Sequence, residues 1–268
     1  MTNYLEVTNL SKSFDSFQLH NISFTLPKGY IMGLIGPNGS GKTTTIKLIL
    51  NMLKRTGGTV KVMGLDNIAE EQKVKSELGV VFDTNYFSDD WKVSQVEKSI
   101  SVFYPNWNSQ KFADMLRKFH IAPTKKVKEL SKGMQMKLML ACAFSYDAKL
   151  LILDEPTSGL GEHSVLFSTH ITGDLERAAD YITYISYGEL YFTGSKDDFV
   201  DMFRIVKGGI EELSDDLKNK AAGIRTFPTG FEALMKTEDI NGFPNLTVDP
   251  ATIDEIVVFT SKKGDDYE

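Results

Sequence analysis

Residues 30–44 read Tyr-Ile-Met-Gly-Leu-Ile-Gly-Pro-Asn-Gly-Ser-Gly-Lys-Thr-Thr. An apolar strand over 30–35 runs into the pattern G-x-x-x-x-G-K-[ST] at 36–43, and a helix over 41–53 is predicted to follow. Such a loop turns its backbone amides around phosphate oxygens, and the helix N-terminus adds a favourable dipole. The alternative is a glycine-rich turn that binds nothing. The predicted phosphate-binding residues are Gly36, Pro37, Asn38, Gly39, Ser40, Gly41, Lys42, Thr43 and Thr44.

Two of these residues carry specific chemistry. Lys42 is expected to reach the β- and γ-phosphates of ATP, and the Thr43 hydroxyl is expected to ligate Mg²⁺. A second carboxylate-bearing strand end supports this expectation, because residues 149–156 read KLLILDEP. Asp154 at that end would be the second holder of Mg²⁺, and Glu155 could polarise the attacking water as a general base. The alternative is that Asp-Glu-Pro only begins a turn.

The pattern around the loop predicts an α/β fold. Strands are expected over 4–8, 17–26, 59–63, 78–82, 150–153, 165–168 and 181–186. Helical spacing dominates 84–147, which predicts a helical insertion. We therefore predict a P-loop ATPase core with an N-terminal antiparallel β-subdomain over residues 1–203, the insertion included, and a small C-terminal α+β appendage over 204–268.

Composition narrows the functional class. The 268 residues include 30 Lys and Arg against 36 Asp and Glu, a net charge of −6, which argues against general nucleic-acid binding. Cys142 is the single cysteine, which excludes an internal disulfide and a cysteine zinc cluster and fits a reducing compartment. No signal peptide pattern is seen, and no apolar run approaches the ~20 residues needed to cross a bilayer.

Taken together, the motifs GPNGSGKT at 36–43, LSKGM at 130–134, LLILDEP at 150–156, SGL at 158–160 and STH at 168–170 resemble those of ABC transporter ATP-binding subunits. The resemblance covers about the first 200 residues. It implies an ATP hydrolase that binds ATP and Mg²⁺, works with an integral membrane permease and pairs with a second copy of itself. It also implies a cytoplasmic location, on the inner face of the membrane through the permease.

The resemblance assigns further residues. LSKGM stands where the family has its signature, so Ser131 and Gly133 would contact ATP held by a second subunit, although Ser131 is also a good helix cap. Lys132 and Met134 depart from the family pattern. His170 matches the family's switch histidine, which hydrogen-bonds the γ-phosphate, and Phe14 matches the aromatic that stacks on adenine. A core role for Phe14 is the alternative.

One position differs from the family. Asp83 stands where the family usually has a glutamine that senses Mg²⁺. It is therefore a metal-site candidate, with a helix-capping Asp as the alternative.

Aromatic residues are dense in the helical insertion, where the family has a groove for a short helix of the permease. They can form the small core of the insertion or anchor the partner in that groove. These residues are Tyr86, Phe87, Trp91, Phe103, Tyr104 and Trp107.

The resemblance extends to direction of transport. The helical region and the tail ATIDEIVVFT are similar to those of bacterial peptide and antibiotic exporters. Export of a peptide or antibiotic-like amphiphile is therefore expected. The alternatives are a soluble ABC-type ATPase acting on nucleic acid or ribosomes, and a P-loop kinase.

The connection after Asp154 is unusually short. Parallel strands need a crossover of a dozen or more residues, usually with a helix, and only 154–164 are available. Gly161 also stands where the family has an Asp. We therefore expect that roughly 20–25 residues belong between Leu160 and Gly161 and are missing from the printed sequence, with a true deletion as the alternative.

Overall fold

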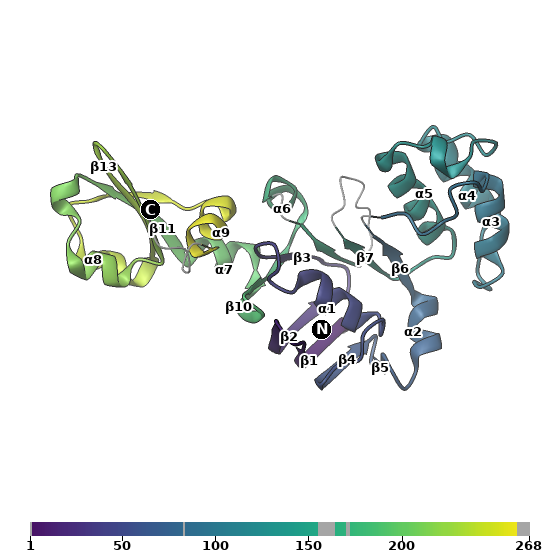
Figure 1. Cartoon of the computed structure of the whole chain (residues 1–268), viewed down its shortest axis with the longest axis horizontal. Coiled ribbons are helices and arrows are strands. Elements are labelled where there is room, and N and C mark those ends of the chain that lie inside the picture. Colours follow the sequence, from purple (N-terminus) through teal and green to yellow (C-terminus); the bar gives the residue numbers. More distant parts are fainter. Residues whose placement is uncertain (1, 83, 155–163, 170–171, 262–268) are drawn as a thin grey trace.

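The computed structural model describes residues 2–82, 84–154, 164–169 and 172–261 (Figure 1). Three parts are visible in Figure 1. A strand-rich centre carries the N-terminus, a helical part with α3, α4 and α5 lies at one end, and a smaller mixed part with β11, β13 and α8 lies at the other. The α/β class predicted from the sequence is confirmed, with its antiparallel N-terminal strands and its helical elements.

The centre is one sheet that contains ten of the described strands in the order β5-β4-β1-β2-β10-β9-β3-β8-β7-β6. The β2–β10 pairing consists of a single residue pair, Glu189 opposite His20, and this pairing joins the two halves of the sheet. The strands are β1 (Asn3–Ser13), β2 (Gln18–Pro27), β3 (Ile31–Ile35), β4 (Gly57–Val62), β5 (Leu65–Asp66), β6 (Leu78–Val81), β7 (Leu150–Asp154), β8 (Ser164–Ser168), β9 (Tyr181–Ser186) and β10 (Glu189–Ser195).

The two halves of the sheet differ in strand direction. Strands β1, β2, β4 and β5 pair antiparallel, whereas β9, β3, β8, β7 and β6 pair parallel. Parallel strands are buried on both faces, so successive residues point into opposite cores. Strand β7 shows this pattern: Leu151 and Leu153 join one hydrophobic cluster, and Leu150 and Ile152 join the other.

Helices cover both sides of this parallel half. α1 (Lys42–Ile49) contributes Ile46 and Ile49 to the cluster shared with the N-terminal strands. The predicted helix over 41–53 therefore ends earlier than expected. α5 (Lys132–Ser145) and α6 (Thr172–Ala178) contribute to the opposite cluster, and the short α2 (Glu71–Glu77) leads into β6.

The helical part confirms the helical spacing of the insertion. It contains α3 (Val93–Ser101), α4 (Ser109–Lys118), the 3-10 turn Val127–Glu129 and α5, with one isolated bridge between Lys92 and Lys126. Phe112 and Leu116 of α4 are buried against α5. The insertion's boundaries at about 84 and 147 stay a prediction.

The C-terminal part has a sheet of its own. Four antiparallel strands lie in the order β12-β13-β11-β14, and the remaining helices flank them. Its elements are α7 (Lys196–Asp201), β11 (Phe203–Gly208), the 3-10 turn Ile210–Glu212, α8 (Asp215–Lys220), β12 (Gly223–Phe227), β13 (Gly230–Lys236), the 3-10 turn Thr237–Gly242, β14 (Thr247–Pro250) and α9 (Ile253–Ser261).

This last part is tied to the centre by α9. Ile253, Ile256 and Phe259 of α9 belong to the same buried cluster as Tyr184 of β9 and Leu175 of α6. The chain's last described helix thus packs back onto the parallel half of the main sheet. The division at 203/204 stays a prediction, although the second sheet begins at Phe203.

The structure describes the two strands that the short connection after Asp154 joins. The two strands are parallel neighbours, with Leu150 opposite Ser164 and Asp154 opposite Ser168, and residues 155–163 connect them. The Leu160–Gly161 junction lies outside the described residues, so the expectation of missing residues there stays a prediction.

Candidate nucleotide-binding site

The loop over 36–43 lies between β3 and α1, as the sequence predicts. Gly36 has a φ of +148° and is enclosed by neighbouring backbone, because an added Cβ would lie 2.0 Å from the carbonyl oxygen of Ile185. Gly41, directly before α1, has a φ of +112° in the left-handed region that favours glycine. These two positions let the chain fold back sharply between the strand and the helix.

The side chain of Lys42 folds over the loop. Its Nζ donates to the carbonyl oxygens of Gly36, at 2.7 Å, and of Pro37, at 3.1 Å, and the residue is only 6% exposed. A buried ammonium held by neutral carbonyls attracts an anion strongly, because both partners are poorly screened by water. Lys42 is therefore placed to meet a phosphate above the loop.

A cavity of about 200 Å³ opens over this loop. Thr43 lies in its wall and is exposed, which leaves its hydroxyl accessible, while Ser40 is buried and its Oγ has no hydrogen-bond partner among the described residues. Backbone amides at a helix N-terminus and hydroxyl groups form a suitable lining for phosphate. The lining residues are Phe17, Asn38, Gly39, Gly41, Lys42, Thr43 and Thr44.

Asp154 ends β7 near the same edge of the sheet. It is 8% exposed, and its Oδ1 accepts a hydrogen bond from the hydroxyl of Ser168 at the end of β8. Ser168 in turn lies opposite Leu34 of β3, two residues before Gly36. Since neighbouring strands are ~4.8 Å apart, the Asp154 carboxylate and the phosphate loop share one edge of the sheet. Its carboxylate and the Thr43 hydroxyl are oxygen donors of the kind that Mg²⁺ prefers.

Three further candidates, Asp83, Glu155 and His170, lie outside the described residues. In the sequence, Glu155 directly follows Asp154, and His170 directly follows Thr169. Thr169 is buried, and its backbone N–H donates to Leu34 at 3.3 Å. The roles of all three stay predictions.

Ser131 and Gly133 lie elsewhere in the chain, at the start of α5. Ser131 caps this helix, since its Oγ accepts from the backbone N–H of Met134 at 3.3 Å. An added Cβ at Gly133 would meet nothing within 4 Å. Neither residue lines the cavity over the phosphate loop. Packing among the described residues thus gives no reason for glycine at 133.

The predicted adenine-stacking residue, Phe14, is 43% exposed at the end of the β1–β2 hairpin. Its ring lies 6.3 Å from that of Phe17, and the Lys12 ammonium lies 5.2 Å from its centroid. The aromatic residue that lines the cavity is Phe17, which the sequence analysis assigned only to a strand. Phe17 packs over Gly41, whose added Cβ would lie 3.1 Å from the ring.

The chain is similar in sequence to a known family of proteins. A family model described as ABC transporter matches residues 19–158. The chain is also 31% identical over 205 residues to ABC transporter ATP-binding protein YtrB of Bacillus subtilis (strain 168), a match covering 69% of this chain and 70% of that protein.

The chain belongs to the ABC transporter family.

Other relatives agree with this assignment. Nod factor export ATP-binding protein I of Sinorhizobium fredii (strain NBRC 101917 / NGR234) is 31% identical over 232 residues, covering 74% of this chain and 64% of that protein. A solved structure described as an ATP binding subunit of an ABC transporter superposes with a TM-score of 0.67 at 25% identity, over 73% of this chain and 91% of that one. The ADP conformation of MJ1267, an ATP-binding cassette of an ABC transporter, gives a TM-score of 0.62 over 74% and 93%, and at 22% identity it supports the fold alone.

Membership in the ABC transporter family settles the general activity. The chain is an ABC ATP-binding subunit, and such subunits bind ATP, hydrolyse it and work with membrane permease components. None of the helices in the described ranges is long and apolar enough to span a bilayer. The narrower resemblance to peptide and antibiotic exporters is not confirmed by these relatives.

This ABC subunit has a second, larger cavity between the sheet and the helical part. It measures about 440 Å³ and is mostly apolar, with Lys75 as its cationic wall residue. Burial there raises the pKa of the Cys142 thiol and of the Tyr146 hydroxyl, so both stay protonated at neutral pH. The lining is Leu50, Met52, Lys75, Leu78, Val80, Phe82, Tyr86, Ile100, Tyr104, Cys142 and Tyr146.

Some aromatic residues of the insertion line this second cavity, which we call the apolar groove, and others lie in the interior of the helical part. Tyr86 and Tyr104 line the groove, and the Tyr104 ring stacks on Tyr146 at 3.7 Å. Phe87 is buried and Trp107 packs against Phe112, so both belong to the core of the helical part. Phe103 is 74% exposed. Trp91, the last of the six aromatic residues, is exposed and does not line the groove.

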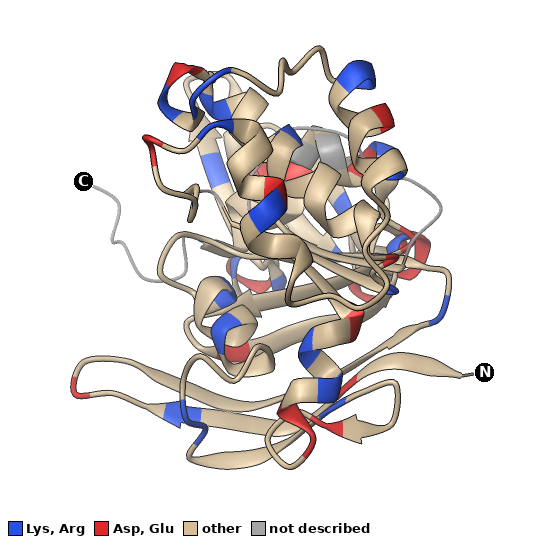
Figure 2. Ribbon diagram, turned by 90° about the vertical axis from the view of Figure 1, so that its right-hand side faces the viewer, with Lys and Arg blue, Asp and Glu red and all other residues tan. Residues whose placement is uncertain are grey.

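Positively and negatively charged residues are interspersed along the chain. Figure 2 shows Lys and Arg interspersed with Asp and Glu, and some form ion pairs, such as Lys126 and Lys128 with Asp90. The expectation that nucleic acid is not a partner stays a prediction.

Proposed function

We propose that two copies of this subunit close around ATP and hydrolyse it in the presence of Mg²⁺, and that this drives a separate membrane permease. The observation that carries the proposal is the shared sheet edge, where Lys42 and the phosphate loop stand two strands away from Asp154. At one sheet edge, the Lys42 ammonium suits a triphosphate and the Asp154 carboxylate suits the cation bound to it.

Each residue of the site has a proposed task. Lys42 binds the β- and γ-phosphates and stabilises the charge that develops on them, and His170 hydrogen-bonds the γ-phosphate. Thr43 and Asp154 are the residues that would hold Mg²⁺, with Asp83 as a further candidate. When bound, Mg²⁺ neutralises phosphate charge. Glu155 orients the attacking water and accepts its proton.

Dimer formation is supported by the start of α5. Gly133 is unconfined in the single chain, and α5 has its N-terminus there, which favours contact with an anion. We propose that Ser131 and Gly133 contact the ATP bound to the second copy. Closure would then bury each nucleotide between two chains.

The apolar groove around Tyr104 is the proposed docking site for the permease. Its aromatic lining and its place between the sheet and the helical part suit an amphipathic helix of a partner, which would anchor the subunit to the inner face of the membrane.

Export is the proposed direction of transport. Relatives named Nod factor export ATP-binding protein I, in Sinorhizobium fredii and two other bacteria, support it. The proposed cargo, a peptide or antibiotic-like amphiphile, rests on the resemblance of the helical region and the tail.

Dimer formation is tested with Glu155→Gln. This variant should bind Mg-ATP but turn over little of it, because the phosphate loop is unchanged. Trapped ATP should then shift the protein to a dimer in size-exclusion chromatography. The matched control carries both Glu155→Gln and Lys42→Ala. It should stay monomeric, because the loss of Lys42 weakens ATP binding. Unchanged hydrolysis in Glu155→Gln would remove Glu155 from the mechanism, and a monomer with bound Mg-ATP would contradict the dimer.

Permease docking is tested by co-purification from membranes. Tyr104→Asp, which places a charge in the groove, should release the subunit into the soluble fraction while leaving its ATP affinity unchanged. The matched control Phe103→Asp alters an exposed neighbour outside the groove and should stay bound. Recovery of the unaltered subunit with ribosomes or nucleic acid instead of membranes would contradict the proposal.

A further inference from the structure

The phosphate loop is supported from behind by the turn between β9 and β10. Tyr187 and Gly188 form this two-residue turn with φ of +49° and +82°, as in a type I′ hairpin. The Gly188 N–H donates to the Ser40 carbonyl at 3.0 Å, and the Gly188 carbonyl accepts from His20 at 2.8 Å. An added Cβ at Gly188 would lie 1.9 Å from the Gln18 carbonyl oxygen. The turn is thus wedged between the loop and β2.

The same turn is held by the C-terminal helix. The Tyr187 hydroxyl donates to the carbonyl oxygen of Ser261, the last residue of α9, at 3.0 Å. The last carbonyls of a helix have no partner within the helix, so this bond caps α9. Tyr187 is 65% exposed, which means that its ring contributes little to the core.

A second, buried hydrogen bond involves Thr260, the residue before Ser261 in α9. The hydroxyls of Tyr184 and Thr260 are 2.7 Å apart. Thr260 gives its own hydrogen to the Ile256 carbonyl, so Tyr184 is the donor of the pair. Tyr184 lies opposite Ile35, the residue before Gly36. Helix α9 therefore contacts the strand beside the phosphate loop as well as the turn behind it.

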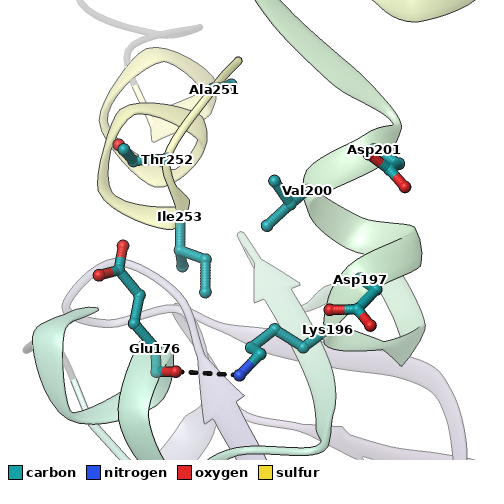
Figure 3. A pocket seen from close by; sticks show the side chains of 8 residues that line it. All are labelled: Glu176, Lys196, Asp197, Val200, Asp201, Ala251, Thr252 and Ile253. Carbon is teal, nitrogen blue, oxygen red and sulfur yellow. Dashed lines mark hydrogen bonds between the residues drawn. The ribbon is translucent and has the colours of Figure 1, made fainter.

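Helix α9 also reaches α6, the helix that follows residues 170–171. Figure 3 shows Ile253 of α9 beside Lys196 and Glu176, around a cavity of about 390 Å³. The Lys196 ammonium donates to the Glu176 carbonyl at 2.9 Å, near the end of α6. Leu175 of α6 packs against Gly33 of β3, where an added Cβ would lie 2.1 Å from it. Helix α9 is thus linked to β3 through α6 as well as through β9.

We propose that Tyr187 is a positioning residue for ATP, through which the C-terminal helix α9 holds the β9–β10 turn against the phosphate loop. The inference rests on the proposed binding of ATP by residues 36–43. A loop held in its binding conformation loses less freedom when the ligand arrives, so its affinity is higher. By reciprocity, bound ATP must stabilise the docking of α9 to the same extent. This gives residues 204–261 a role in nucleotide affinity.

The test removes one oxygen atom. Tyr187→Phe keeps the ring and should raise the dissociation constant for a non-hydrolysable Mg-ATP analogue about three- to tenfold, as the loss of one hydrogen bond allows. The kcat at saturating ATP should stay unchanged. The matched control is Tyr191→Phe in β10, whose ring contacts Tyr184 and whose hydroxyl has no hydrogen bond found among the described residues. Its affinity should equal that of the unaltered protein.

Hydrogen exchange supplies the reciprocal measurement. The analogue should slow amide exchange in α9 of the unaltered full-length protein and of Tyr191→Phe, and this protection should be lost in Tyr187→Phe. Equal affinities in all three proteins, or equal protection of α9 in all three, would overturn the inference. If the unaltered protein bound no analogue, the proposed site at 36–43 would fail instead, so the two failures are distinguishable.

Discussion

Ser168 donates its hydroxyl hydrogen to the carboxylate of Asp154, across the paired ends of β8 and β7. Both side chains are buried, with Ser168 fully inaccessible and Asp154 8% exposed. A hydrogen bond to a buried carboxylate fixes the direction of its oxygens and offsets part of the loss of water. The strand beside β7 therefore orients the acid that we assign to Mg²⁺.

This bond predicts a stability difference between two serines. Ser168→Ala should lower the free energy of unfolding by about 1–3 kcal/mol, because a buried charged acceptor loses a partner. Ser145→Ala is the matched control, since Ser145 is also buried and its hydroxyl donates to the neutral Ala141 carbonyl of its own helix. Urea denaturation measures both. An equal or larger loss in Ser145→Ala would contradict the assignment.

The substitution Asp154→Asn removes the negative charge of this side chain and keeps its shape. Asp154→Asn keeps an oxygen that can accept from Ser168, so the fold should be retained. It should abolish the gain in ATP affinity that Mg²⁺ gives, while affinity in excess EDTA stays close to that of the unaltered protein. Calorimetric titration with and without Mg²⁺ measures this difference. An unchanged Mg²⁺ dependence would remove Asp154 from the metal site.

A substitution at Gly133 should affect the stability of the single chain and the activity of the dimer differently. With nothing within 4 Å of an added Cβ, Gly133→Ala should leave the single chain as stable, or stabilise it by up to about 1 kcal/mol as alanine does in a helix. ATP turnover should nevertheless fall, because the new methyl group obstructs the partner's phosphates. Thermal melting and hydrolysis rates on one preparation test this. Normal turnover would leave Ser131–Gly133 as a helix start only.

The two phenylalanines near the loop should behave differently. Phe14→Ala should weaken ATP binding by about 1 kcal/mol if the exposed ring stacks on adenine, and Phe14→Tyr should be nearly neutral. Phe17→Ala should lower both ATP affinity and stability, because Phe17 also packs over Gly41. Equal ATP affinity in Phe14→Ala and the unaltered protein would show that Phe14 does not contact the base.

Local patterns explain why much of the site could be predicted from the sequence. The phosphate loop needs glycines at fixed positions between a strand and a helix, and this requirement is visible in residues 36–43 alone. Asp154 was found in the same way, since it ends an uninterrupted apolar strand. Strand order and register then bring Asp154 near Lys42, which sequence spacing alone does not show.

Features that depend on distant contacts were missed. Phe17 could not be distinguished from Phe14 by pattern, since only packing over Gly41 places it in the cavity wall. The Tyr187–Gly188 turn has an ordinary hairpin sequence, and its contact with Ser40 appears only after β9 is placed beside β3. The C-terminal residues were predicted only as a small α+β appendage, without their four-stranded sheet, because the partly exposed strands have weak alternation.

The central claim is that Lys42 and its loop bind the phosphates of ATP. Mg-ATP titration of the unaltered protein, Lys42→Ala and the control Lys47→Ala, in the same helix, tests it most directly. We expect saturable binding by the unaltered protein and by Lys47→Ala. The affinity of Lys42→Ala should be about 10- to 100-fold weaker, because a charged hydrogen-bond donor is lost. Equal affinity in all three proteins, or no binding by the unaltered one, would show that Lys42 and its loop do not bind the phosphates.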